Sequence, residues 1–446
     1  MNGFRLMKTA GNFFFGFKFI LRFPVYNGII NERKGGAFIM KMKRTITRTV
    51  ALITASLLFA VMILTGGNGV FSSAAAASGT PVYSSSDLFT DRDLKQTADM
   101  SDAATLSASD GGTIRITEAG TYVLTGTASD CTFYVEAGDD DKVQLVLQGL
   151  HITNSDFPCI YVYNADKVFI TTAEDSSLTV NGTFRTDGSI RTDGAVFCRT
   201  DLVMNGTAVL TIQSTDNGVV CKDDLKITGG TYTVTANSKA FEANDSIRIM
   251  DGTFILRAGT DGLHAENSDD DSQGYIYIGG GELTITCGDD GLHATSVLQI
   301  DDGTLTITAA EGLEGSFIQV NGGTVNITAS DDGINAARKS TSTEVAVEFN
   351  GGTVNVTMGG GDTDGVDSNG NLYVNGGVIS VNGNSTFDYD GTVAFNGGTI
   401  YVNGQQTTTI PNQFFGGGRG GWGNGWNSTP NENAGQGGRG GGRRGW

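Results

Sequence analysis

Short runs of alternating apolar and polar residues dominate the chain between about residues 106 and 405. Leu305 and Ile307, for example, follow the glycine-centred unit 302–304, and Leu298 and Ile300 precede it. Nine such units recur at spacings of 20 to 29 residues. Alternation with period two in β-branched and aliphatic residues predicts strands with one buried face.

A third short strand is expected after a recurring Asp-Gly or Glu-Gly turn, as at Asp290-Gly291 and Asp332-Gly333. Three strands in about 22 residues are too few for a propeller blade, and no helical pattern intervenes. We therefore predict an all-β fold, a parallel β-helix of about a dozen coils in residues 106–410. The paired glycines are placed where the chain turns sharply between sheets and a positive φ is needed.

The two ends of the chain differ from this body. A basic start at Lys41, an apolar stretch over 50–64 and small residues at 74–77 predict a signal peptide over residues 40–77 and an exported, extracellular or surface protein. Residues 1–39 are interpreted as an upstream extension ahead of a start at Met40 or Met42, because the codons that can encode 33–36 resemble a ribosome-binding site. A genuine 39-residue extension is the alternative. Residues 78–105 are expected to form a leader or a cap over the first coil, and 411–446 a disordered Gly/Asn/Arg/Trp-rich tail.

The charge balance indicates the kind of partner. The chain has 29 basic and 48 acidic residues, and residues 1–77 hold ten of the former and one of the latter. So acidic a body favours metal ions over nucleic acid. The five cysteines lack a CxxC spacing, and Cys198 and Cys221 occupy similar places in neighbouring repeats, so we expect buried stacked thiols, with one disulfide as the alternative.

Equivalent positions of stacked coils form columns about 4.8 Å apart. The Asp-Gly position gives the first column, Asp193, Asn217, Asp261, Asp290, Glu311, Asp332, Asp364 and Asp390. Three residues later lies the second column, Glu242, His264, His293, Glu314, Asn335 and Asp367. Neighbouring carboxylates at about 4 Å repel by roughly 4 kcal/mol, so either their pKa values rise or a hard cation lies between coils.

Calcium suits such oxygen ligands. The candidate calcium ligands are Asp261, Asp289, Asp290, Glu311, Glu314, Asp331, Asp332, Asn335, Asp364 and Asp367. The alternative is that these residues are only turn formers, because Asp-Gly is an ordinary turn dipeptide.

Several stretches resemble the calcium-binding, carbohydrate-binding parallel β-helix proteins of clostridia and their relatives, once a domain of unknown function. They are FTDRD (89–93), VQLVLQGLHITNS (143–155), IYVYNADKVFIT (160–171) and the serial DG(L/I)HA and NGGT units. The resemblance implies a right-handed, pectate-lyase-like helix, several calcium ions, export, and binding of cellulose and acidic plant polysaccharide such as pectin. The segment 331–335 also resembles the calcium motif of family 9 polysaccharide lyases, with Asn335 in place of the last Asp.

A binding protein is favoured over an enzyme. Outward positions of successive strands, Tyr277, Gln299, Gln319, Glu348 and Tyr373, continue from Lys226 and Arg248 and form a predicted strip for a linear polymer. The runner-up is a calcium-dependent lyase, for which Arg338 and Lys339 are the best candidate bases. A structural surface or spore-coat protein is the third class. We expect a monomer without a transmembrane helix in the mature protein.

Overall fold

The computed structural model describes residues 81–360 and 363–412. The predicted extension 1–39, the signal peptide 40–77 and residues 413–446 of the predicted tail lie outside this part. None of the helices in the described part is long and apolar enough to cross a membrane.

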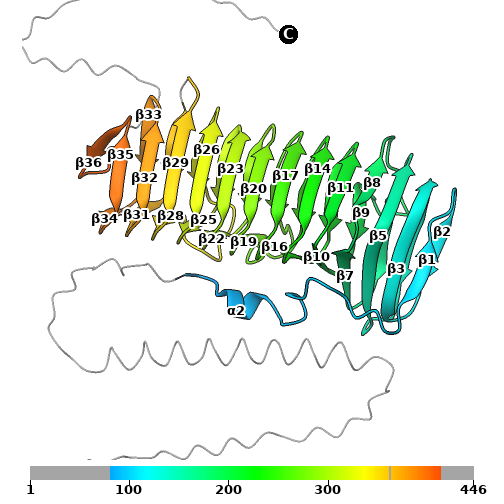
Figure 1. Cartoon of the computed structure of the whole chain (residues 1–446). Helices are drawn as coiled ribbons and strands as arrows, with labels where there is room; N and C mark the ends of the chain where they lie inside the picture. Colours follow the sequence, from blue (N-terminus) through cyan, green and yellow to red (C-terminus); the bar gives the residue numbers. More distant parts are fainter. Residues whose placement is uncertain (1–80, 361–362, 413–446) are drawn as a thin grey trace, which may run out of the picture. The chain divides into compact units, whose positions relative to one another are not determined.

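The described chain forms coils that stack their strands in parallel, as Figure 1 shows. A twelve-stranded sheet makes face 1, and the second sheet folds over two long strands, β3 (Gly120–Ser129) and β5 (Lys142–Asn154), into faces 2 and 3. The first half of β5 pairs with the first strand of face 2, and its second half pairs with the first strand of face 3. The predicted parallel β-helix is therefore confirmed, with twelve coils in the described residues when counted on face 1.

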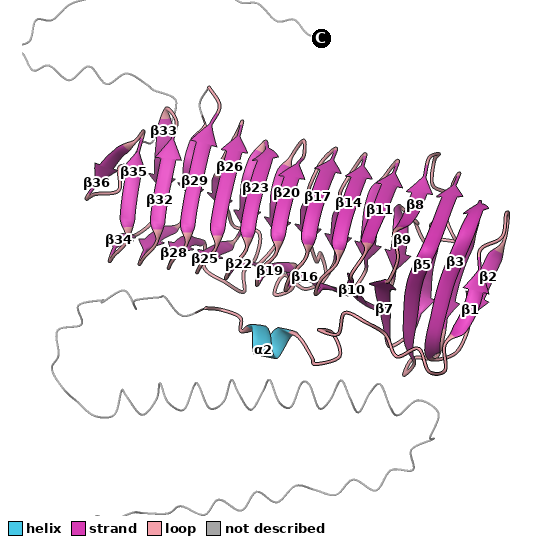
Figure 2. Ribbon diagram, in the orientation of Figure 1, coloured by secondary structure: helices cyan, strands magenta, loops and turns pink. Residues whose placement is uncertain are grey.

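Strands of the three faces follow one another in each coil, and strands dominate the ribbon in Figure 2. Face 1 contains β2 (Thr113–Ile116), β4 (Thr132–Glu136), β6 (Ile160–Asn164), β9 (Gly194–Cys198), β12 (Asn217–Cys221), β15 (Phe241–Ala243), β18 (Leu263–Ala265), β21 (Asp290–Ala294), β24 (Glu311–Gly315), β27 (Ile334–Ala336), β30 (Asp364–Ser368) and β33 (Ser385–Tyr389). Face 2 contains β7 (Lys167–Thr172), β10 (Asp201–Gly206), β13 (Asp224–Ile227), β16 (Ser246–Ile249), β19 (Tyr275–Ile278), β22 (Val297–Ile300), β25 (Phe317–Val320), β28 (Ala346–Phe349), β31 (Asn371–Val374) and β34 (Val393–Phe395). Face 3 contains β8 (Ser176–Val180), β11 (Val209–Ser214), β14 (Thr231–Ala236), β17 (Thr253–Ala258), β20 (Glu282–Thr286), β23 (Thr304–Ala309), β26 (Thr324–Ala329), β29 (Thr353–Met358), β32 (Val378–Asn382), β35 (Thr399–Val402) and the antiparallel end strand β36 (Gln405–Thr407). Strand β1 (Ala104–Ser107) pairs with β3 in the first coil.

The core is a stack of aliphatic side chains between the faces. Leu283, Leu305, Val325 and Val354 lie in register on successive coils, and all four are fully buried. The alternating runs thus place one residue in two inside, as predicted. Cys198 and Cys221 also align in register, and both are buried and free.

Where a turn between faces 2 and 3 contains two glycines, the two have different roles. Gly323 has a φ of 74°, which favours glycine. A Cβ on Gly322 would lie 2.2 Å from the backbone oxygen of Asp301, so this position needs glycine because the neighbouring coil is close. Asparagines beside the glycines form a ladder, since Nδ2 of Asn350 donates to Oδ1 of Asn321 at 2.7 Å and the next coils continue this pattern.

Residues 78–105 were expected to form a leader or a cap, and their described part 81–97, here called the N-terminal segment, lies beside the coils rather than over the first one. It includes the short helix α2 (Ser85–Leu88) and runs along face 2. Its Gln96 accepts a hydrogen bond from the backbone of Gly206, and its Val82 backbone N–H donates to Gln319. The segment therefore spans the coils from β10 to β25.

Candidate functional site

The polar columns lie on face 1, along its outward positions. Register places His264 opposite His293, then Glu314, Asn335 and Asp367 on the following strands, so the predicted second column is confirmed in its geometry. The structure extends this column to Asp388, which pairs with Asp367.

The first column forms through bonds between coils. Asp261 Oδ1 accepts a hydrogen bond from the backbone N–H of Asp290 at 3.2 Å, and Asp332 Oδ1 accepts one from Asp364 at 3.0 Å. These carboxylates therefore also act as turn formers. Asp390 and Asp193 were placed in this column wrongly, because Ser385 is the residue opposite Asp364 and Gly194 is the residue opposite Asn217.

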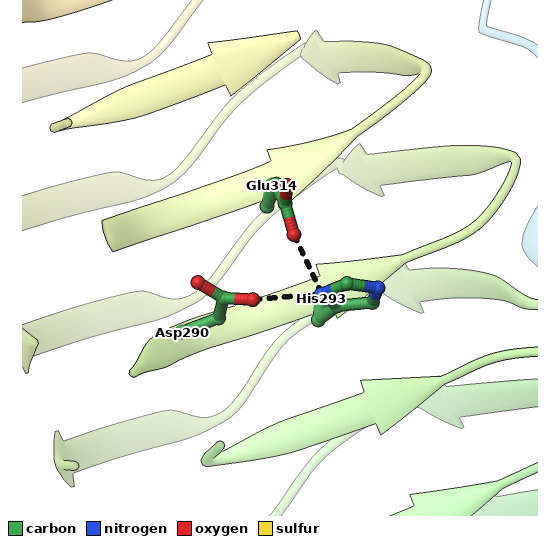
Figure 3. A group of neighbouring side chains, drawn as sticks. All are labelled: Asp290, His293 and Glu314. Atoms are coloured by element: carbon green, nitrogen blue, oxygen red, sulfur yellow. Dashed lines mark hydrogen bonds and ion pairs between the residues drawn. The ribbon is translucent and has the colours of Figure 1, made fainter. Parts of the chain in front are cut away.

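A histidine sits in the middle of the predicted metal ligands (Figure 3). Nδ1 of His293 lies 2.7 Å from Asp290 Oδ2 and 2.6 Å from Glu314 Oε2, and Lys339 Nζ lies 2.6 Å from the other oxygen of Glu314. Burial opposes charge on His293, but the two carboxylates raise its pKa to about 9. The chain's own cations thus neutralise this part of the column.

The pKa values of the two carboxylates beside His293 are shifted in opposite directions. Burial raises the pKa of Asp290 to about 6. Burial also acts to raise the pKa of Glu314, but hydrogen bonds from His293 and Lys339 lower it to about 2. On the preceding coil His264 Nδ1 lies 2.8 Å from Asp261, and its ring stacks on that of His293 with centroids 4.4 Å apart.

Three carboxylates from Glu311 onward, other than Glu314, have raised pKa values and lack a cationic partner in the described residues. Burial first, and neighbouring carboxylates with it, raise the pKa of Glu311 and of Asp367 to about 7 and that of Asp332 to about 6. No ion pair within residues 81–360 and 363–412 involves any of the three. We call Glu311, Asp332, Asn335, Asp364 and Asp367 the acidic cluster.

The donor set of the acidic cluster fits a hard cation. Nδ2 of Asn335 donates to Glu311 at 3.0 Å, which leaves the buried Oδ1 of Asn335 without a hydrogen-bond donor in the described structure. Carboxylate and amide oxygens, the donor types of this cluster, are the ligands that Ca²⁺ takes. Asp289 and Asp331 contribute less, because both are exposed and their side chains make no hydrogen bond or ion pair in the described part.

The sequence patterns did not reveal a second acidic group. Carboxylate oxygens of Asp201, Asp223 and Asp224 lie within 4.8 Å of one another where face 1 turns into face 2. Burial and the neighbouring acids raise the pKa of Asp223 to about 7, while Asp224 pairs with Arg248 at 2.6 Å. The Asp223-Asp224 pair was the available signal, but it lies outside both predicted columns.

The predicted polymer-binding strip on face 2 is covered by the N-terminal segment. Tyr277, Gln299, Gln319 and Glu348 are at most 1% exposed, and Tyr373 is partly buried. Within this strip the backbone N–H of Tyr83 donates to Gln299 Oε1 at 2.8 Å, and Gln299 Nε2 donates back to Tyr83 O at 2.9 Å. The expectation of an open strip is therefore wrong for this structure.

Apolar and ionic contacts complete the cover. Leu88 and Phe89 are buried against Tyr275 and Tyr277, and the Phe89 and Tyr277 ring centroids lie 6.2 Å apart. Arg248, another predicted member of the strip, lies over the Tyr275 ring. The strip is thus an internal packing surface, which leaves the polar columns of face 1 as the predicted site that the N-terminal segment does not cover.

The profile of one protein family matches residues 110–316 and 310–407, which together span most of the twelve coils. The chain belongs to the carbohydrate-binding domain-containing protein family. A relative of the same description from Acetivibrio thermocellus is 29% identical over 200 residues, which cover 44% of this chain and 70% of the relative. A solved structure, the polysaccharide lyase-like protein from C. thermocellum in a gadolinium derivative, matches with a TM-score of 0.45 and 27% identity. This match covers 50% of this chain and 96% of the other.

Proposed function

We propose that this carbohydrate-binding protein is exported and binds acidic polysaccharide at face 1 with the help of calcium. Export rests on the signal-peptide pattern in residues 40–77, and an acidic polymer rests on the calcium chemistry of the column. The observation that carries the proposal is the acidic cluster, where Glu311, Asp332 and Asp367 lie on three successive coils and none of them is in an ion pair within the described residues.

The calcium site proposed on face 1 would be formed by side chains of the acidic cluster. Asp332, Asp364, Asp367 and the free Oδ1 of Asn335 would hold the ion. Calcium bound there supplies positive charge that bridges the protein to carboxylates of a uronate polymer. The cluster alone would repel such a polymer, since both partners are anionic.

Elimination chemistry is the alternative activity, and the contacts of its candidate base disfavour it. Lys339 Nζ lies 2.6 Å from Glu314, so its side chain is engaged in an ion pair with a carboxylate of the column rather than directed at a substrate proton. Arg338 is exposed, with no hydrogen bond or ion pair in the described part of the chain. We therefore expect binding without cleavage.

The test is retention of the full exported protein on polygalacturonate and on cellulose, in calcium and in chelator. We expect retention on polygalacturonate in calcium and its loss in chelator. An absorbance assay for unsaturated sugar products, run on the same samples, should stay flat. Equal retention in chelator would refute the calcium role, rising absorbance would establish a lyase, and no retention on either polymer would favour a structural surface protein.

A further inference from the structure

A cleft on face 1 departs from the acidic character of the rest of that face. It has a volume of about 490 Å³ and lies at β9, β12 and β15 beside the loop that precedes β9. Arg191, Arg199, Lys222 and Lys239 line it. These are four of the fifteen basic residues in the described chain, and only three acidic residues line the cleft with them. The cleft therefore has an excess of basic side chains, whereas the acidic cluster farther along face 1 has an excess of acidic ones.

The acid at the centre of the cleft is already satisfied. One oxygen of Glu242 lies 2.7 Å from Lys222 Nζ, and the other lies 3.3 Å from Lys239 Nζ and accepts a hydrogen bond from Asn217 at 3.1 Å. Burial opposes charge on Glu242, but the two lysines hold its pKa below the ordinary value. Each ammonium carries three N–H donors and uses one on Glu242, so both keep donors for a ligand.

A second observation points to a ligand in the same cleft. Asp193 is 7% exposed, and its Oδ1 is buried without a hydrogen-bond partner in the described structure. Its Oδ2 lies 3.3 Å from Arg191 Nε. A buried acceptor without a donor costs free energy, and that cost is removed when the Asp193 carboxylate, which lines the cleft, turns to meet a donor such as a ligand hydroxyl.

We propose that this cleft binds one acidic sugar unit directly, with its carboxylate on Lys222 and Lys239 and a hydroxyl donating to Asp193. The inference rests on the proposed function, because the ligand is a unit of the same acidic polysaccharide. The cleft lies five strands from Asp367 along the same outward column. This is about 24 Å at the usual strand spacing, so a polymer reaches both places and a short oligosaccharide does not.

The two places on face 1 differ in their need for calcium. The acidic cluster requires a cation before it attracts an anion, whereas the cleft presents its own cations. Binding of a short acidic sugar to the cleft is therefore independent of calcium. The cleft would set the position of the polymer, and the calcium site would add affinity through a second point of attachment.

The test is isothermal titration of the full protein with trigalacturonate, an acidic trisaccharide, at millimolar concentration in chelator. We expect binding by the wild type, and a loss of about tenfold or more in affinity in Lys239→Gln, since one charged contact is removed. Arg191→Gln serves as a second variant with an expected loss of affinity, because its side chain lines the cleft and is 75% exposed, so we expect the variant to fold. Lys142→Gln, an exposed lysine on face 2, should bind like the wild type.

Three outcomes overturn the inference. The wild type does not bind trigalacturonate, or it binds the neutral trisaccharide maltotriose equally well, or Lys239→Gln and Arg191→Gln each bind trigalacturonate as tightly as the wild type. These results are separable from a failure of the proposed function. Trisaccharide binding in chelator combined with calcium-independent retention of the polymer would refute the calcium role and keep the cleft. Calcium-dependent retention of the polymer without trisaccharide binding would support the calcium role and refute the cleft as a binding site.

Discussion

Asp93 and Lys226 form an ion pair at 3.1 Å although both side chains are almost fully buried, at 1% and 8% exposure. The pair joins the N-terminal segment to β13 on face 2. Around it Thr228 Oγ1 donates to the backbone oxygen of Asp93, and the backbone N–H of Thr90 donates to its carboxylate. The segment is therefore part of the fold.

The Lys226→Gln variant tests this anchorage. It should lower the free energy of unfolding by about 3 kcal/mol, because a buried carboxylate loses its main partner. Adding Asp93→Asn should recover much of the loss, since no unpaired charge then remains. Denaturant unfolding measures both, with Lys142→Gln as the exposed control. A loss in Lys226→Gln no larger than in the control would contradict a buried anchor.

The glycine pairs provide a test of coil stacking. Gly322→Ala should destabilise the protein by about 2 kcal/mol or more, because its Cβ would meet the backbone oxygen of Asp301. Gly360→Ala is the matched control, since a Cβ there has no atom within 4 Å. Thermal unfolding compares the two variants. Equal midpoints would mean that neighbouring coils are not in close contact at this turn.

The pH dependence of the calcium-free protein follows from the acidic cluster. The pKa values of Glu311, Asp332 and Asp367 are raised by burial and by neighbouring carboxylates, so the folded state binds more protons than the unfolded chain. Stability is then greatest below the unfolded pKa values near 4 and falls as the pH rises to about 7. Groups with lowered pKa values, such as Glu314, act only below pH 4.5.

The melting temperature in chelator should thus be higher at pH 5 than at pH 8. His293, with its pKa raised to about 9, acts in the same direction above pH 6.5. Saturating calcium should reduce the difference, because the bound ion favours ionised ligands. A calcium-free protein that is more stable at pH 8 would show that the carboxylates do not repel one another.

Two amide substitutions locate calcium along the column. Asp367→Asn should raise the melting temperature in chelator, since it removes repulsion, and should reduce the rise on adding calcium. Glu314→Gln should lower the melting temperature in chelator, because His293 and Lys339 lose their partner, and should keep the calcium response. Thermal scans with and without calcium measure all four changes. A calcium response that is lost in Glu314→Gln and kept in Asp367→Asn would place the ion near Glu314 and contradict a site in the acidic cluster.

The coils and columns could be predicted from the sequence because they depend on local period and on repeat spacing. The alternation at Leu305 and Ile307 and the Asp-Gly turns fix which side chains face outward, whatever the rest of the chain does. Both ends of the first column were wrong, because the last coil places Ser385, not Asp390, opposite Asp364, and Gly194, not Asp193, is opposite Asn217.

The cover over the predicted strip could not be foreseen from these patterns. Its contacts join residues far apart in sequence, such as Tyr83 and Gln299, and the N-terminal segment has no periodic pattern. The neutralisation of Glu314 by His293 and Lys339 was missed for a related reason. Lys339 belongs to an inserted loop, and its position depends on how that loop returns to face 1.

The most direct test of the account is a calcium titration of the metal-free protein, with and without saturating polygalacturonate. If calcium joins the acidic cluster to the polymer, each must raise the affinity for the other by the same factor. We predict tighter calcium binding in the presence of the polymer, and loss of this gain in the double variant Asp332→Asn/Asp367→Asn. Calcium affinity that is the same with and without polygalacturonate would contradict the account.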